Sequence, residues 1–148
     1  MGNYYIGPIL GLIYFLFHFL IIKNKIKEFK FLLFAIFICI VVESTLSYIG
    51  FINYMGLLPK KYGIIPLWII ILWGGFSLTV FHSFKWILGR YKVSFILGGI
   101  IIPLFYLSGD KVGAIFLKYS LIYSYLCLSI LWAFCFLLLI YVATIIDE

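Results

Sequence analysis

Charged residues in this chain of 148 residues occur almost only in short clusters, and the apolar stretches between the clusters have the length of a bilayer crossing. A helix needs about 20 mostly apolar residues to cross the hydrocarbon core of a membrane. The charged clusters are residues 23–30, 60–61, 85–92 and 110–111. This spacing predicts a small protein that crosses a membrane several times.

The composition excludes an ordinary water-soluble fold. Charged residues make up 11% of the chain and hydrophobic residues 66%, whereas soluble domains are about one-quarter charged and about half apolar. Inside a bilayer the backbone must satisfy its own hydrogen bonds, either in helices or in a closed barrel. Because the sequence lacks the strict alternation of apolar and polar residues that a barrel requires, we expect an all-α, polytopic membrane helical bundle.

About five spans fit into one transmembrane domain that covers residues 1–148. The expected spans are residues 4–22, 29–52, 64–87, 91–107 and 119–146. The fourth span is the shortest and contains Gly98, Gly99 and Pro103. We therefore expect it to be kinked or to enter the membrane only partly, with neighbouring helices covering the freed backbone groups.

The distribution of positive charge predicts the orientation. The first and third connecting segments together carry seven Lys or Arg residues, and the opposite side carries four. Lys and Arg are enriched in cytoplasmic loops, so the N-terminus is expected outside and the C-terminus inside. The net charge of +6 is then explained by membrane topology, and we expect no nucleic-acid partner.

Glu43 is the polar residue that most needs an explanation, because it lies near the middle of the second expected span. An ionised carboxylate at that depth costs at least a few kcal/mol. One interpretation is a carboxylate that handles protons or binds a ligand. The other is a neutral acid that holds helices together by hydrogen bonds.

Two histidines also fall inside expected spans. Helical spacing places His82 on one face with Trp68 and Trp86, and the predicted orientation gives His18 a similar depth, nearer the cytoplasmic surface than Glu43. Two imidazoles and a carboxylate could bind a metal ion. However, no HxxxH, ExxH or CxxC spacing is present, so we predict neither a metal site nor a cofactor.

Ser108, Gly109 and Asp110 lie between the fourth and fifth spans. Residues of these types favour tight turns, and a turn is the simpler interpretation. The alternative is that Asp110 contacts a substrate at the mouth of the bundle.

Two motifs resemble those of a known family. Residues 66–86 contain the pattern PxW…LWxxF…HS…W, and residues 102–114 resemble GPLxYxxGxxxGA, with Ile102 in place of the usual Gly. Both patterns are typical of an uncharacterised bacterial inner-membrane family, a domain of unknown function. The resemblance implies a membrane or lipid setting. It also emphasises one set of residues spread over three helices, namely Glu43, Trp73, His82, Tyr106 and Gly109.

Catalytic signatures such as GxSxG, HExxH, the P-loop and the dinucleotide fingerprint are absent from the sequence. We therefore predict a non-catalytic component of the bacterial inner membrane. Its expected partners are membrane lipids, another membrane protein or a second copy of the chain. The candidate binding residues are Trp73, Tyr106, Gly109, Asp110 and His18.

The alternative is an intramembrane enzyme or carrier for a lipid-like or small hydrophobic substrate. Glu43 would then act as acid or base, His82 as its proton partner, and Tyr106 or Asp110 would orient the substrate. This scheme requires Glu43 and His82 to lie within hydrogen-bonding reach. Their estimated difference in depth is about 9 Å at 1.5 Å per residue, which argues against it.

Overall fold

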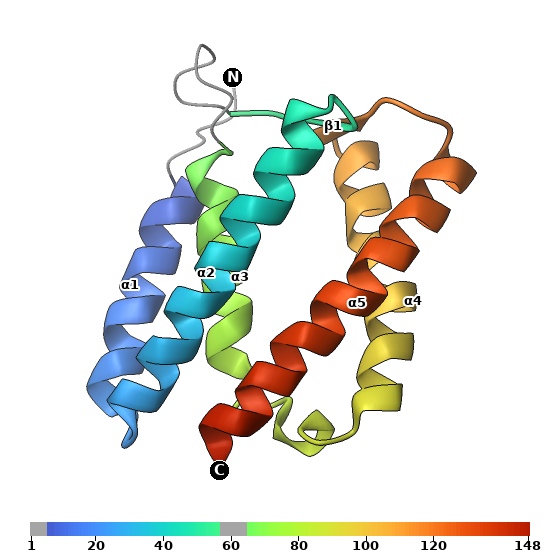
Figure 1. Cartoon of the computed structure of the whole chain (residues 1–148). Helices are drawn as coiled ribbons and strands as arrows, with labels where there is room; N and C mark the ends of the chain where they lie inside the picture. Colours follow the sequence, from blue (N-terminus) through green and yellow to red (C-terminus); the bar gives the residue numbers. More distant parts are fainter. Residues whose placement is uncertain (1–5, 57–64) are drawn as a thin grey trace.

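The computed structural model describes residues 6–56 and 65–148. Within these residues, five α-helices run side by side and two short strands cover one end of the bundle (Figure 1). The elements are α1 (Ile6–Ile21), α2 (Lys25–Tyr48), β1 (Ile52–Tyr54), α3 (Leu67–Thr79), the 3-10 helix η2 (Lys85–Ile87), α4 (Tyr91–Lys111), β2 (Ile115–Leu117) and α5 (Leu121–Asp147). Of the helices described, α2, α4 and α5 are long and apolar enough to cross a membrane, and α1 and α3 are shorter apolar helices.

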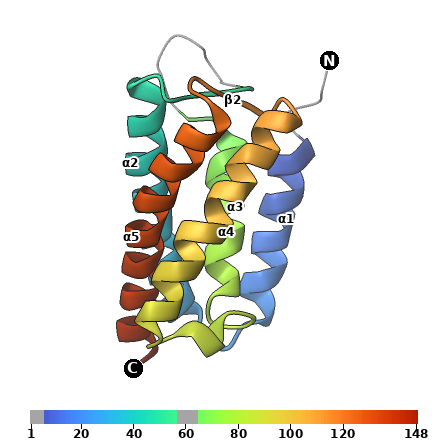
Figure 2. The same ribbon diagram turned by 90° about the vertical axis from the view of Figure 1, so that its right-hand side faces the viewer.

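The helices form two groups that meet at an aromatic core. Helix α3 packs against both α1 and α2, while α5 packs against α4 and also contacts α2 (Figures 1 and 2). Gly98 allows α4 and α5 to approach closely, because a Cβ atom there would lie 2.6 Å from both the Trp132 carbonyl oxygen and the Phe136 Cβ. Small residues commonly permit such contacts between membrane helices.

The pairing of the two strands shows that α2 and α4 run in the same direction. β1 follows α2, β2 follows α4, and the strands pair antiparallel with Ile52 opposite Leu117 and Tyr54 opposite Ile115. Both helices therefore end at the same end of the bundle, here called the sheet end. The opposite end, called the lysine end, holds the α1–α2 turn, η2 and the end of α5, where Lys27 and Lys85 pair with Asp147.

The second and third expected spans have the wrong boundaries. Helix α2 begins within the lysine cluster and ends at Tyr48, because the chain turns at Gly50, which has a φ of +68°, and continues into β1. Helix α3 ends at Thr79 instead of continuing to residue 87. The Thr79 hydroxyl donates to the Phe76 carbonyl at 2.7 Å, and Thr79 is followed by turns. His82 and Trp86 are therefore not on the expected helical face.

Helix α4 is longer than the fourth expected span. Helix α4 continues through the buried Pro103 as far as Lys111, because the neighbouring helices and the bundle interior tolerate the missing backbone donor. After the helix the chain turns at Gly113, whose φ of +71° favours glycine, and the Ala114 N–H donates to the Gly109 carbonyl at 2.9 Å. Residues 108–110 thus form the last helical turn, and the predicted tight turn was wrong.

Helices α1 and α5 coincide with the first and fifth expected segments to within a few residues, and α1 is one of the shorter apolar helices. Residues 4 and 5 of the first segment and residue 64 of the third lie outside the described residues. The expectation of helices alone needs one correction, since residues near 52 and 115 form strands. These strands give each other the hydrogen bonds that a loop would otherwise leave unpaired.

Candidate functional site

Helix α2 carries two buried glutamates, and each is the centre of a separate polar cluster. Glu28 is 4% exposed and Glu43 is 1% exposed. They are separated by about 22 Å along the helix, at 1.5 Å per residue, so they lie towards opposite ends of the bundle. Buried carboxylates need hydrogen-bonding partners, and the partners of the two glutamates are of different chemical types.

The Glu43 cluster consists of Glu43, Tyr54, Trp73 and Tyr106. The Trp73 Nε1–H donates to Glu43 Oε1 at 2.9 Å, and the Tyr106 hydroxyl donates to the same oxygen at 2.6 Å. The Tyr54 hydroxyl donates to Glu43 Oε2. Because the donors come from α3, α4 and β1, one carboxylate on α2 connects four elements of the fold.

Aromatic rings close the Glu43 cluster on its remaining side. The ring of Trp132 on α5 lies 4.9 Å from that of Trp73 and 5.8 Å from that of Tyr106, measured between centroids. Burial raises the pKa of Tyr54, and the nearby Glu43 carboxylate raises it further, so this hydroxyl stays protonated and keeps donating. The arrangement favours the interpretation in which Glu43 holds helices together.

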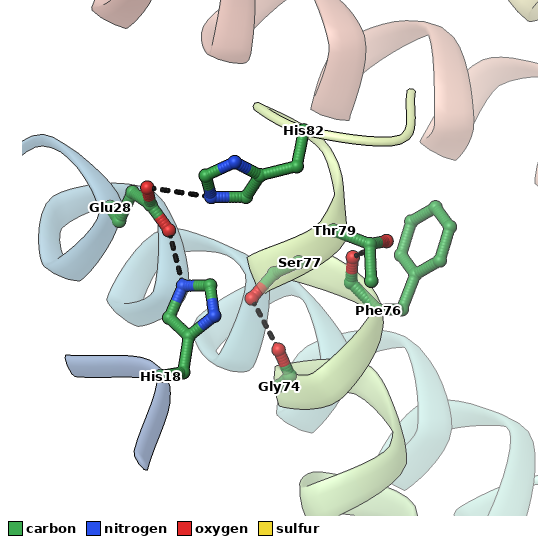
Figure 3. Close-up of polar contacts among 7 residues, drawn as sticks. All are labelled: His18, Glu28, Gly74, Phe76, Ser77, Thr79 and His82. Carbon is green, nitrogen blue, oxygen red and sulfur yellow. Dashed lines mark hydrogen bonds and ion pairs between the residues drawn. The ribbon is translucent and has the colours of Figure 1, made fainter. Parts of the chain in front are cut away.

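The histidine cluster consists of His18, Glu28 and His82. His18 Nε2 lies 2.5 Å from Glu28 Oε2, and His82 Nε2 lies 2.9 Å from Glu28 Oε1. Figure 3 shows the two imidazoles approaching the carboxylate from α1 and from the turn after α3. The ring centroids of the histidines are 5.4 Å apart.

Local structure explains why these three side chains meet. The turn between α1 and α2 is short, with His18 three residues before the end of α1 and Glu28 three residues after the beginning of α2. The early end of α3 at Thr79 releases His82 from the helix axis (Figure 3). Glu28 also lies in the first turn of α2, where the helix macrodipole favours a negative charge.

The histidine cluster is accessible, unlike the Glu43 cluster. His18 and His82 line a cleft of about 480 Å³ whose other walls include Tyr14, Phe17 and Leu78. The side chain of His82 is 50% exposed, whereas that of Glu28 is 5% exposed. Two imidazoles at an opening with a buried carboxylate behind them can exchange protons or hold a cation.

A second cleft, here called the lysine cleft, lies at the same end of the bundle. It has a volume of about 780 Å³ and is lined by Lys23, Asn24, Lys25, Ile26, Lys27, Lys30, Ile145 and Ile146. The ion pairs of lysine within residues 6–56 and 65–148 involve Lys27 and Lys85, both with Asp147. Lys23, Lys25 and Lys30 are exposed, and their charges face the solvent or a ligand.

The structure divides the residues that the sequence suggested as one site. Trp73 and Tyr106 do meet Glu43, whereas His82 meets Glu28 and His18 instead. No hydrogen bond joins Glu43 to His82 within the described residues, so the geometry does not favour a proton-transferring pair of these two residues.

Gly109 and Asp110 belong to neither cluster. Asp110 Oδ1 accepts a hydrogen bond from the Leu117 N–H at 2.9 Å, and a Cβ atom at Gly109 would lie 3.4 Å from the Ile115 side chain. Both residues therefore support β2, and a contact between Asp110 and a substrate remains a prediction.

Sequence reasoning missed Glu28 and Tyr54. Glu28 lies among lysines and resembles an ordinary loop charge, but its position opposite His18 across the α1–α2 turn could have identified it. Tyr54 is eleven residues from Glu43 and follows the end of α2. No sequence pattern indicates that a strand returns its hydroxyl to the helix.

Comparison with known proteins identifies a family but no activity. A family model described as "Protein of unknown function (DUF2878)" matches residues 2–138. Neither the curated proteins nor the solved structures contain a significant match to this chain. The resemblance to an uncharacterised family is confirmed at this level, and the chain belongs to the DUF2878 family of proteins of unknown function.

Proposed function

We propose that this protein is a non-catalytic integral membrane component that binds anionic lipid headgroups in the lysine cleft. The observation that carries the proposal is the combination of exposed lysines with apolar walls in one cleft at the end of the bundle. Such a surface matches an anionic phospholipid, which joins a phosphate to acyl chains.

The proposal includes five crossings of the membrane. Because β1 and β2 pair, α2 and α4 both run from the lysine end to the sheet end. If both helices cross the membrane, the chain between them must return, and α3 is the segment that does so (Figure 2). At 1.5 Å per residue α3 is only about 20 Å long, and the turns at residues 80–87 add to the length of this return.

The lysine end is proposed to face the cytoplasm of a bacterial cell, following the excess of Lys and Arg there. The cytoplasmic leaflet carries anionic lipids, and each Lys or Arg near its surface contributes about 1 kcal/mol to attraction. The first turn of α2 adds to this attraction because Asn24 makes no side-chain cap, and free N–H groups at a helix N-terminus favour anions.

The test is a lipid titration of the purified protein in mild detergent, followed by native mass spectrometry. Phosphatidylglycerol is the anionic probe and phosphatidylcholine the zwitterionic reference. The variant Lys23→Gln/Lys25→Gln should weaken phosphatidylglycerol binding by roughly 20- to 30-fold, which corresponds to about 2 kcal/mol for two lysines. Lys27 is left intact because it pairs with Asp147.

The matched control is Lys111→Gln/Lys118→Gln, which removes two lysines on the α4–α5 side of the sheet end. This control should leave phosphatidylglycerol binding unchanged. Equal affinity of the wild type for both lipids would contradict the proposal. A protein partner or a second copy occupying the cleft in place of lipid would support a partner-binding component instead.

A further inference from the structure

The histidine cluster combines the three side-chain types that suit a divalent transition metal. Imidazole nitrogen and carboxylate oxygen are both ligands of Zn²⁺, and two histidines with one carboxylate are a known ligand set for zinc and for non-haem iron. One ring nitrogen of His18, one ring nitrogen of His82 and a Glu28 oxygen all lie within 4.8 Å of one another. These atoms converge on one point from three different elements of the fold.

The distances require little rearrangement. Ligand atoms on a tetrahedral zinc ion are separated by about 3.3 Å, given metal–ligand bonds of about 2.0–2.1 Å. The contacts from the two Glu28 oxygens to His18 and His82 are 2.5 and 2.9 Å, so each would lengthen by less than about 1 Å. Ligand atoms as far apart as 4.8 Å would approach each other by up to about 1.5 Å. Both imidazoles already direct Nε2 towards the carboxylate, and an ion bound between them would replace the protons that they share with it.

The surroundings provide a route and a free coordination position. The two histidines line the cleft of about 480 Å³, with apolar walls that include Phe17, Ile21 and Leu78. Glu28 lies behind them, and its burial limits the contact of water with the carboxylate, so that water competes less with the carboxylate for a bound ion. Three protein ligands with one side open are typical of reactive rather than closed structural zinc sites.

We propose that His18, Glu28 and His82 form a binding site for one divalent transition-metal ion, with the fourth position open to the cleft. This inference goes beyond the proposed lipid binding and is independent of it, because the lysine cleft shares none of its lining residues with the histidine cluster. It also revises the prediction from sequence that no metal is bound.

The test is isothermal titration of the metal-free protein in detergent with Zn²⁺, after removal of any affinity tag. We expect one ion per chain. His18→Ala, Glu28→Gln and His82→Ala should each weaken binding by more than about 100-fold, because losing even an indirect partner of a metal ligand costs 10–100-fold. The matched control is Asp147→Asn, which removes a carboxylate from the same end of the bundle and should not change binding.

A second measurement tests zinc binding in the wild type, where the folding defect of a variant plays no part. The chain contains only two histidines, so ¹⁵N-labelling of histidine gives the signals of two imidazoles in the wild type. Stoichiometric Zn²⁺ should shift both sets of ring signals. Absence of stoichiometric binding to the folded wild type would overturn the proposal. Unchanged ring signals on addition of Zn²⁺ would also overturn it, as would variants that bind Zn²⁺ as tightly as the wild type does.

Discussion

The two polar clusters on α2 start from the same residue type and differ in enclosure. Glu43 accepts from a tryptophan and two tyrosines, which are protonated donors at neutral pH, and aromatic rings surround it. Glu28 meets two histidines, whose nitrogens can donate, accept or bind a metal, beside an open cleft. A buried acid therefore does not identify a reactive site unless its partners are chemically versatile and accessible.

The largest expected effect comes from Glu43→Ala. The substitution leaves three donors on three elements without an acceptor, two of them buried and one partly buried, and each unsatisfied buried donor costs about 1–3 kcal/mol. We expect a loss of about 3–5 kcal/mol in the free energy of unfolding, measured by SDS titration in mixed micelles with tryptophan fluorescence. Glu43→Gln keeps an acceptor and should lose less. If Glu43→Ala had the same midpoint as the wild type, Glu43 would not support the fold, and the contrast with Glu28 would be lost.

Gly98→Ala tests whether α5 closes the Glu43 cluster. The added Cβ would lie 2.6 Å from the carbonyl oxygen of Trp132, which cannot move without shifting α5. We expect a loss of about 1–3 kcal/mol by the same titration, as for other overpacked cores. Gly7→Ala is the control, because nothing lies within 4 Å of its Cβ. Equal stability of the two variants would show that α4 and α5 pack less closely.

Glu28→Ala should cost less than Glu43→Ala. The two imidazoles that lose their partner line a cleft where water can replace the carboxylate. We expect a loss of about 1–2 kcal/mol in metal-free protein, again from the denaturant midpoint. A loss as large as that of Glu43→Ala would mean that Glu28 supports the fold as strongly, and the comparison would fail.

Tyr106→Phe removes one donor from the Glu43 cluster and leaves the ring in contact with that of Trp132. We expect a loss of about 1 kcal/mol, the usual value for one hydrogen bond. Because both residues belong to one cluster, the double variant Glu43→Ala/Tyr106→Phe should lose less than the sum of the single losses. Strict additivity would indicate that the two side chains do not interact.

The smallest effect is expected for Asp147→Asn, which provides a partly exposed reference for both glutamates. Asp147 pairs with Lys27 and lies 3.8 Å from Lys85. Exposed ion pairs contribute about 1 kcal/mol or less and are screened by salt. The midpoint should therefore move slightly at low salt and hardly at all at high salt. A large shift of the midpoint that does not depend on salt concentration would mean that Asp147 behaves as a buried residue.

Much of the helical arrangement was predictable from sequence, and the errors have local causes. The length of the apolar runs located all five helices, but hydrophobicity alone could not show that α3 ends at Thr79 or that α4 passes through Pro103. Those outcomes depend on hydroxyl–carbonyl bonds and on packing. For the site, the depth estimate argued against a contact between Glu43 and His82, and in the structure these residues have different hydrogen-bonding partners. Nothing in the sequence indicated Tyr54, because a strand returns its hydroxyl to Glu43. For Glu28, the α1–α2 turn indicates the approach to His18, whereas the contact with His82 depends on the tertiary structure.

The sequence by itself determined that this is a helical, strongly apolar protein with its positive charge in a few clusters, because the hydrophobic effect depends on composition and spacing. Which polar side chains meet was decided only by the tertiary structure. Hydrogen bonds act over about 3 Å, and such distances between α1, α2 and α3 are fixed by packing and by turns. The elements that pack against α2 thus enclose Glu43 among hydrogen-bond donors and leave the cluster around Glu28 open to a cleft.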